Sequence, residues 1–177
     1  MSSVIYTKRL VLRPFRVTDI DAFAELCADP EVMQYIGNGQ PLDRATVEAK
    51  VRHWMALYAE QGFGLLAVVP EGEYDCIGFC GLVQQLIDGQ YHIELGYRLH
   101  KDYWGQGLAT EAAQAVKTFT FNQLSLQEVV SIIHPHNKAS MRVAEKVGLS
   151  RWKETTFQDK PVVIYRAVEE QAILRQA

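Results

Sequence analysis

Hydrophobic residues recur along the chain with two spacings, and each spacing predicts a different kind of element. In residues 18–27 and 43–61 apolar side chains stand three or four positions apart, which indicates amphipathic helices. Residues 9–13 are a short apolar run closed by Pro14, and residues 65–69, 77–85 and 91–99 are three further apolar or alternating runs, separated from one another by turns that contain glycine. These last three strands, joined by short turns, predict an antiparallel meander.

The pattern changes in the second half of the chain. Residues 105–123 and 137–147 have helical spacing, whereas residues 128–133, 153–157 and 161–167 have the composition of strands. A meander followed by alternating strands and helices predicts an α/β fold: a mixed, mostly antiparallel sheet with one parallel pair and helices on both faces. Because no repeat or linker interrupts the pattern, we expect one domain over residues 1–177.

Composition narrows the possible roles of the protein. Of the 177 residues 48% are hydrophobic, which suffices for a sizeable core, and the net charge of −3 argues against direct binding of nucleic acid. No segment has the ~20 consecutive apolar residues that cross a bilayer, and the N-terminus lacks the order of a signal peptide, so we expect a cytoplasmic protein. Cys27, Cys76 and Cys80 form no CxxC pair and no zinc-like cluster. They are expected to be buried structural thiols, with no metal bound.

One predicted strand and the turn after it contain the first candidate site. Along residues 91–99, the polar side chains of His92 and Glu94 share one face, opposite an apolar face. The following turn contains Gly105 and Gly107 and opens a helix, whose free N–H groups and dipole suit a phosphate or pyrophosphate. An ordinary tight connection between strand and helix is the alternative interpretation.

The details of this turn exclude one class of phosphate ligand and disfavour another. Gly107 is not followed by the Lys-Ser/Thr pair of a P-loop, so an NTPase of that type is excluded. Thr110 stands where a dinucleotide fingerprint needs its third glycine, and Glu128 begins the next strand instead of ending it. A nicotinamide-dependent oxidoreductase is therefore only a remote alternative.

The second candidate site lies at the start of the last predicted helix. Asn137 is suited to cap this helix, and Ser140 shares a stripe with Val143, Ala144 and Val147. That stripe should face the sheet, which would turn the Ser140 hydroxyl inward beside the end of the preceding strand. The alternative is a serine that bonds only to backbone of its own turn.

These segments together resemble the GNAT superfamily of acyl-CoA-dependent N-acetyltransferases, and within it the RimJ/RimL-like subgroup, which includes ribosomal-protein N-terminal acetyltransferases. The resemblance covers nearly the whole chain. It rests on Arg9-Leu10-Val11-Leu12-Arg13-Pro14, on Glu94-Leu95-Gly96-Tyr97 through Trp104-Gly105-Gln106-Gly107-Leu108-Ala109-Thr110-Glu111-Ala112, and on Asn137-x-x-Ser140 through Glu145-Lys146-Val147-Gly148-Leu149. Trp104 stands where the family often has Arg or Gln, as is common in this subgroup.

The resemblance implies how acetyl-CoA binds. The fourth and fifth strands of such a sheet splay apart, and the pantetheine arm lies in the gap. Asn137 matches a residue that contacts the cofactor. The pantetheine would bond to backbone around Tyr97, Arg98 and Leu99, and the pyrophosphate to N–H groups of Gly105, Gln106, Gly107, Leu108, Ala109 and Thr110.

The implied reaction is direct acetyl transfer from acetyl-CoA to a primary amine. Glu94 is the candidate base, acting through water, and His92 is the alternative. A backbone N–H near residues 95–97 would stabilise the thioester oxygen. By resemblance Ser140 protonates the departing thiolate; Tyr97 and Tyr165 are weaker candidates for this acid.

A non-catalytic acyl-CoA sensor that uses the same turn is the second hypothesis. The acceptor is open among a protein N-terminus, an amino acid, a polyamine and an antibiotic amine. The acidic turn at residues 70–75 and the helix that starts near Asp43 are expected to border the acceptor site and attract cationic amines. The chain is expected to be a monomer or a homodimer, since a closing strand edge can pair.

Overall fold

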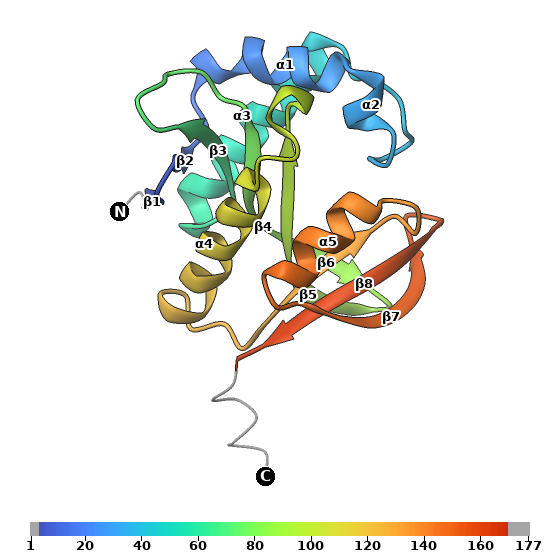
Figure 1. Cartoon of the computed structure of the whole chain (residues 1–177). Helices are drawn as coiled ribbons and strands as arrows, with labels where there is room; N and C mark the ends of the chain where they lie inside the picture. The colour runs from blue at the N-terminus through green and yellow to red at the C-terminus, as the bar shows by residue number, and fades with distance from the viewer. Residues whose placement is uncertain (1–3, 170–177) are drawn as a thin grey trace.

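The computed structural model describes residues 4–169, and the strands in that part of the chain form one sheet of eight in the order β1-β2-β3-β4-β5-β6-β8-β7 (Figure 1). Among the strand pairs of the described chain, only β5–β6 is parallel. The strands are β1 (Ile5–Tyr6), β2 (Leu10–Pro14), β3 (Leu65–Pro70), β4 (Gly78–Ile87), β5 (Gln90–Leu99), β6 (Glu128–Ile133), β7 (Ser150–Phe157) and β8 (Lys160–Val168). The α-helices are α1 (Ile20–Ala28), α2 (Pro30–Met33), α3 (Arg44–Gln61), α4 (Leu108–Asn122) and α5 (Lys138–Lys146), and the 3-10 turns are η1 (Val17–Asp19) and η2 (Lys101–Tyr103).

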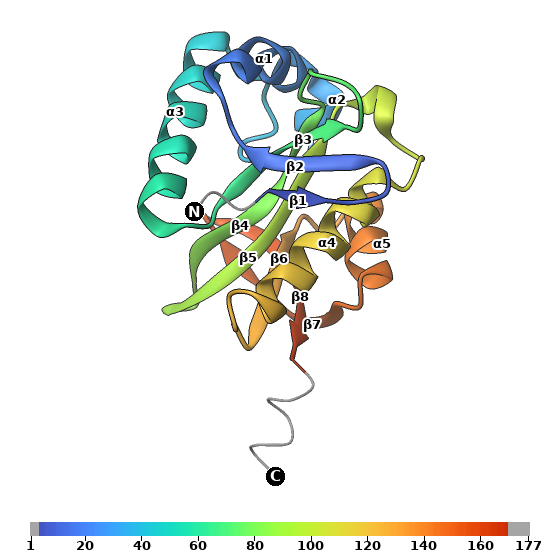
Figure 2. The same cartoon turned by 90° about the vertical axis from the view of Figure 1, so that its left-hand side faces the viewer.

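Helices cover both faces of the sheet, as the sequence pattern predicts. Helices α1, α2 and α3 pack on one face, in a cluster that contains Phe23, Val47 and Phe79. Helices α4 and α5 pack on the other face, and Figure 2 shows them across the strands from α3. The mixed α/β architecture is confirmed. The predicted extent of one domain, residues 1–177, includes residues 1–3 and 170–177, which lie outside the described part.

The predicted elements are present, and their ends follow from local chemistry. The side chain of Asp43 accepts a hydrogen bond from the Thr46 amide and so caps α3, which ends where Gly62 turns left-handed (φ 77°). The predicted helix over residues 105–123 begins only at Leu108, because Gly105 and Gly107 have φ of 73° and 78° and keep the chain out of the helix. The two-residue strand β1 and the short helix α2 are too short to leave a periodic pattern.

The parallel pair is joined over a short length only. Strands β4 and β5 pair over ten residues, but β5 and β6 are in register only at Glu94 and Val130. Beyond this point the Ser131 hydroxyl donates to the Leu95 carbonyl at 2.7 Å, so a side chain replaces the next backbone bond. The gap therefore lies between β5 and β6. The resemblance implies a gap between the fourth and fifth strands, and the numbering differs because the sequence pattern does not predict the short strand β1.

The three cysteines of the described chain are buried and free, as expected of structural thiols. Burial raises the pKa of the Cys76 thiol to about 12. No helix within residues 4–169 is long and apolar enough to cross a membrane.

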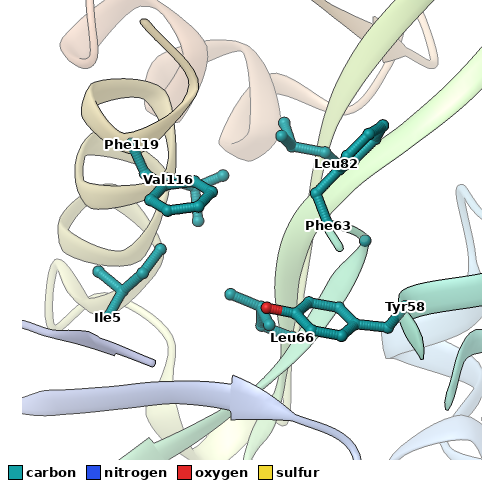
Figure 3. A pocket seen from close by; sticks show the side chains of 8 residues that line it. Ile5, Tyr58, Phe63, Leu66, Leu82, Val116 and Phe119 are labelled. Carbon is teal, nitrogen blue, oxygen red and sulfur yellow. The ribbon is translucent and has the colours of Figure 1, made fainter. Parts of the chain in front are cut away.

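A small apolar cavity lies between α4 and the opposing sheet (Figure 3). Ile5, Val116 and Phe119 face Tyr58, Phe63, Leu66 and Leu82 across it, as Figure 3 shows. Its volume is about 10 Å³, which is at the lower limit for a single water molecule. It is a packing defect and too small for a substrate.

A buried ion pair fixes the start of α1 to the sheet. The Arg13 guanidinium donates two hydrogen bonds of 2.8 Å to Asp19, whose side chain is only 2% exposed. Asp19 also accepts the Arg16 amide at 2.7 Å. The pair thus joins β2 to the turn that begins the helical layer.

We expect Asp19→Asn to lower the free energy of unfolding by about 3 kcal/mol, because it leaves the Arg13 charge buried without its partner. Asp21→Asn is the matched control. Asp21 pairs with Arg44 but is 79% exposed, so its loss should cost less than about 0.5 kcal/mol. Urea unfolding measures both values, and equal effects of the two substitutions would contradict the assignment.

Candidate functional site

A cleft of about 410 Å³ opens where β5 and β6 separate. Its floor is formed by β4, β5 and β6, and its walls by the segment after α2, by α3, by the start of α5 and by the turn between β7 and β8. The turn lies across from α2 in Figure 1, and Lys160 on β8 donates to the Gly37 carbonyl. The sequence candidates that line the cleft are Glu94, Tyr97, Arg98, Asn137 and Ser140.

Glu94 lies on the face of β5 that looks toward α1–α3. The Gln85 amide donates to its carboxylate at 2.7 Å, and the Ile132 backbone N–H stabilises the same charge. Loss of hydration nevertheless raises the pKa of Glu94, because it outweighs these two donors. The carboxylate is therefore a stronger base than an exposed one.

His92 shares this face of β5 but lies outside the cleft. Its Nδ1 is 2.8 Å from Glu128 Oε1, and its ring is 7% exposed beneath the edge of Trp152. Glu128 in turn pairs with Arg166 at 2.8 Å. His92 is therefore not among the residues that line the cleft, and its role as the alternative base stays a prediction that this position does not favour.

Ser140 is held by hydrogen bonds to its backbone. Its amide donates to Asn137 Oδ1 at 3.1 Å, and its carbonyl accepts the Tyr97 hydroxyl at 2.7 Å. The Ser140 hydroxyl has no partner within residues 4–169, so it does not bond to its own turn. Ala144 and Val147 are buried against the sheet, which confirms the predicted orientation of the stripe.

The two tyrosines considered as acids are less well placed. Burial raises the pKa of Tyr97 above its usual range, and its proton is already donated to the Ser140 carbonyl. The Tyr165 hydroxyl donates to Glu145 at 3.1 Å and lies outside the cleft. Of the three hydroxyls considered as the acid, Ser140 is thus the one in the cleft whose proton is not already donated.

The backbone of β5 faces the gap at alternate residues. The Leu95 carbonyl accepts the Ser131 hydroxyl, and the Leu99 carbonyl accepts Trp104 Nε1 at 2.8 Å. Because carbonyl direction alternates along a strand, the N–H and C=O of Tyr97 also turn toward the gap. The backbone of Arg98 turns instead toward β4, where Arg98 is paired with Phe79.

The glycine-containing turn lies between β5 and α4, away from the cleft floor. The N–H groups of Leu108, Ala109 and Thr110 have no acceptor in the described chain, as expected for the first turn of a helix. Arg9 braces the turn by donating to the Gln106 carbonyl at 3.0 Å and to Glu111 at 2.7 Å. Free donors at the start of a 15-residue helix fit a phosphate group.

The expected acidic rim of the acceptor site is wrong. Residues 71–75 do not line the cleft; the turn is tied to Arg9, whose carbonyl accepts the Glu71 amide at 2.8 Å. Helix α3 does reach the cleft, with Lys50 and Trp54. The sequence shows that residues 70–75 form an acidic turn, but it does not show at which end of the sheet this turn lies.

Sequence reasoning missed several residues of the cleft. The position of Gln85 could have been predicted from the β4–β5 hairpin. The two-residue turn at Asp88 and Gly89 sets a register in which Gln85 lies opposite His92 and diagonal to Glu94. Tyr35 and His134, whose rings are 5.0 Å apart, come from distant segments and had no sequence signal.

Comparisons with known proteins agree on one family. Residues 9–150 match the family model described as an acetyltransferase (GNAT) domain. The chain is 35% identical to the protein YkkB of Bacillus subtilis (strain 168) over 168 residues. This match covers 91% of this chain and 93% of YkkB. The structure is similar to that of an acetyltransferase from Agrobacterium tumefaciens str. C58, with a TM-score of 0.81, 29% identity and coverage of 94% and 95%. The fold is also similar to that of RimL, a ribosomal L7/L12 alpha-N-protein acetyltransferase in complex with coenzyme A, with a TM-score of 0.77, 17% identity and coverage of 94% and 98%.

We expect Gln85→Leu to raise the pKa of Glu94 further, because it removes a donor that stabilises the ionised carboxylate. Titration of the Glu94 side-chain carbon by NMR measures the change. Gln84→Leu is the control, since Gln84 is exposed on the opposite face of β4. A Glu94 pKa that is the same in both variants would show that the hydrogen bond does not form in solution.

Proposed function

The chain belongs to the GNAT family of acetyltransferases, and we propose that it transfers an acetyl group directly from acetyl-CoA to a primary amine in the β5–β6 cleft. The observation that carries this proposal is the presence of Glu94 and Ser140 in one cleft, on opposite sides of the gap between the strands. One group can accept a proton and the other can donate one. A sensor that only binds acyl-CoA would need neither.

The glycine-containing turn and the open edge of β5 would hold acetyl-CoA. The N–H groups of residues 105–110 would bind its pyrophosphate, with Arg9 fixing the shape of the turn. Its pantetheine arm would bond to the backbone that Tyr97 turns toward the gap, with Leu99 and Asn137 nearby. Acetyl-CoA supplies the reactive thioester, and no metal is part of the proposal.

Glu94 would remove a proton from the acceptor ammonium, because only a neutral amine attacks a thioester. The proton would pass through a water molecule. A general base works best when its pKa lies near the operating pH, and burial shifts the pKa of Glu94 in that direction. The hydrogen bond from Gln85 keeps the carboxylate oriented. The Tyr97 N–H, beyond the last registered pair of β5 and β6, would stabilise the negative charge on the thioester oxygen.

Ser140 would give its proton to the departing thiolate. Asn137 and Tyr97 fix the serine backbone at 3.1 and 2.7 Å, so the hydroxyl is the group free to move. We assign the chain to the RimJ/RimL-like subgroup because it has Trp104 and the three motifs in order; RimL shares its fold. A cytoplasmic location and the monomer or homodimer state stay predictions.

Calorimetric titration tests acetyl-CoA binding first, with NADPH in a parallel cell. We expect micromolar affinity for acetyl-CoA alone, about −8 kcal/mol. Arg9→Gln should weaken this affinity several-fold while changing stability by less than about 1 kcal/mol, since the Arg9 side chain is 45% exposed and Glu111 keeps its hydrogen bonds from the Thr7 hydroxyl and the Arg9 amide. Arg52→Gln, on the exposed surface of α3, is the control. Binding of NADPH and not acetyl-CoA would reject the proposed function.

We expect Glu94→Gln and Ser140→Ala each to lower kcat by about 10²- to 10⁴-fold without loss of acetyl-CoA affinity. Release of CoA thiol in the presence of an amine panel measures kcat. In the parent enzyme kcat should rise with pH through the raised pKa of Glu94, because the base works when ionised. Gln85→Leu should move this rise to higher pH.

The control for these variants is Glu60→Gln, at the exposed end of α3. It should keep the parent kcat and pH profile. If Glu94→Gln and Ser140→Ala both retain full activity, the two roles are assigned to the wrong residues.

A further inference from the structure

Arg98 brings a positive charge into the cleft wall, and no carboxylate of the described chain pairs with it. Within residues 4–169 the hydrogen-bond partners of its Nη1 are two sulfur atoms, Cys27 Sγ at 3.7 Å and Met33 Sδ at 3.5 Å, and its guanidinium lies 5.2 Å from the centre of the Phe79 ring. Its Nε is buried without a hydrogen-bond partner in the described chain. Thiol and thioether sulfurs are weak acceptors, so most of the hydrogen-bonding capacity of this guanidinium is unused.

The charge around Arg98 is not balanced elsewhere in the cleft. Of the four Lys, Arg, Asp and Glu side chains that line it, three are cationic: Lys50, Arg98 and Lys160. Lys50 has no ion-pair partner within residues 4–169, and Glu94 is the single anion. The cleft is thus positive although the chain carries a net charge of −3. Such a lining favours an anionic ligand.

The phosphates of acetyl-CoA are not the anion that this position fits. The Arg98 side chain lies on the sheet face packed by α1 and α2, as its contacts with Cys27 and Met33 show. The glycine-containing turn opens α4, which packs on the other face. A ligand that reaches Arg98 therefore lies on the acceptor side of the sheet.

The spacing on β5 sets the shape of that ligand. Glu94 and Arg98 share one face, four residues apart, which separates their Cα atoms by about 13 Å on an extended strand. Between and above them the cleft wall is apolar and aromatic, with Trp54, Phe79 and Val83. An amine at Glu94 and an anion at Arg98 would belong to one molecule with an apolar middle.

We propose that the acceptor is a small-molecule amine that carries a carboxylate several bonds from its amino group, with Arg98 binding the carboxylate. This inference rests on the proposed function, because it assumes that the amine reacts beside Glu94. Lys50 adds attraction at the mouth of the cleft. Arg98 is then a specificity-determining residue, and Glu94 and Ser140 act on the reacting atoms.

Matched acceptors test the proposal. The ω-amino carboxylates of about four to eight carbons are compared with alkylamines and diamines of the same length, by release of CoA thiol at saturating acetyl-CoA. We expect kcat/KM to be about 10- to 100-fold higher for the amino carboxylate of the best length, as for one charge-assisted hydrogen bond. Arg98→Gln should remove this preference through KM, and Arg98→Lys should restore part of it.

Further variants keep the test independent of folding. Lys50→Gln, at an exposed site, should lower the carboxylate preference by a smaller factor, and Arg52→Gln on the same helix should leave it unchanged. Neutral amines or diamines that react as well as the amino carboxylates would overturn the inference while leaving the acetyltransferase proposal intact. If no acceptor reacts, calorimetry in the presence of CoA measures the affinity for the amino carboxylates and for the alkylamines and diamines. Equal affinity for the two groups of compounds would overturn the inference. Failure of acetyl-CoA to bind would instead remove the proposed function itself.

Discussion

The short pairing of β5 with β6 is the constraint on which the rest of this structure depends. A parallel pair that ends after Glu94 and Val130 leaves backbone groups of two central strands without partners. Buried polar groups cost about 1–3 kcal/mol each when they stay unpaired. Side chains provide the missing bonds: Ser131 reaches the Leu95 carbonyl, and Trp104 reaches the Leu99 carbonyl. The Tyr97 hydroxyl then crosses the gap to the Ser140 carbonyl and ties β5 to α5.

These bonds keep the gap open at a defined width. The backbone of Tyr97 is left facing the gap between two satisfied carbonyls, and the start of α5 is held against it. The same opening separates two environments. On the α4 side a helix begins with free N–H groups, whereas on the α1–α3 side the cleft is aromatic and positively charged. A donor and an acceptor that enter from opposite faces can meet in the gap.

Local chemistry made much of this arrangement predictable from sequence. Helix ends were set by side chains that cap them, such as Asp43 and Asn137, and by glycines that must be left-handed. The two-residue turn at Asp88 and Gly89 determines the register of β4 and β5, and so the neighbours of Glu94. The orientation of Ser140 followed from the apolar stripe of its helix. In each case the information lies within a few residues of the element that it describes.

What could not be predicted depends on partners distant in sequence. Alternation placed His92 beside Glu94, but its burial comes from Glu128 and Trp152. The acidic turn has the composition of a charged rim, yet sheet topology puts it beside Arg9 and away from the cleft. The side chain of Arg98 was not singled out, because its exceptional feature is that no carboxylate within residues 4–169 lies near it. An absence of this kind is visible only once the whole fold is known.

Glu94 and Arg98 set the polarity of the cleft at a cost to the stability of the fold. Both are charged groups taken out of water on one face of a single strand, and they are too far apart to pair with each other. Burial raises the pKa of Glu94 and lowers that of Arg98, because removal from water destabilises the charged form of each group. A fold optimised only for stability would place apolar side chains at both positions. Charges kept apart in this way are instead suited to a ligand that brings an ammonium to one and an anion to the other, since binding then supplies the partners that folding does not.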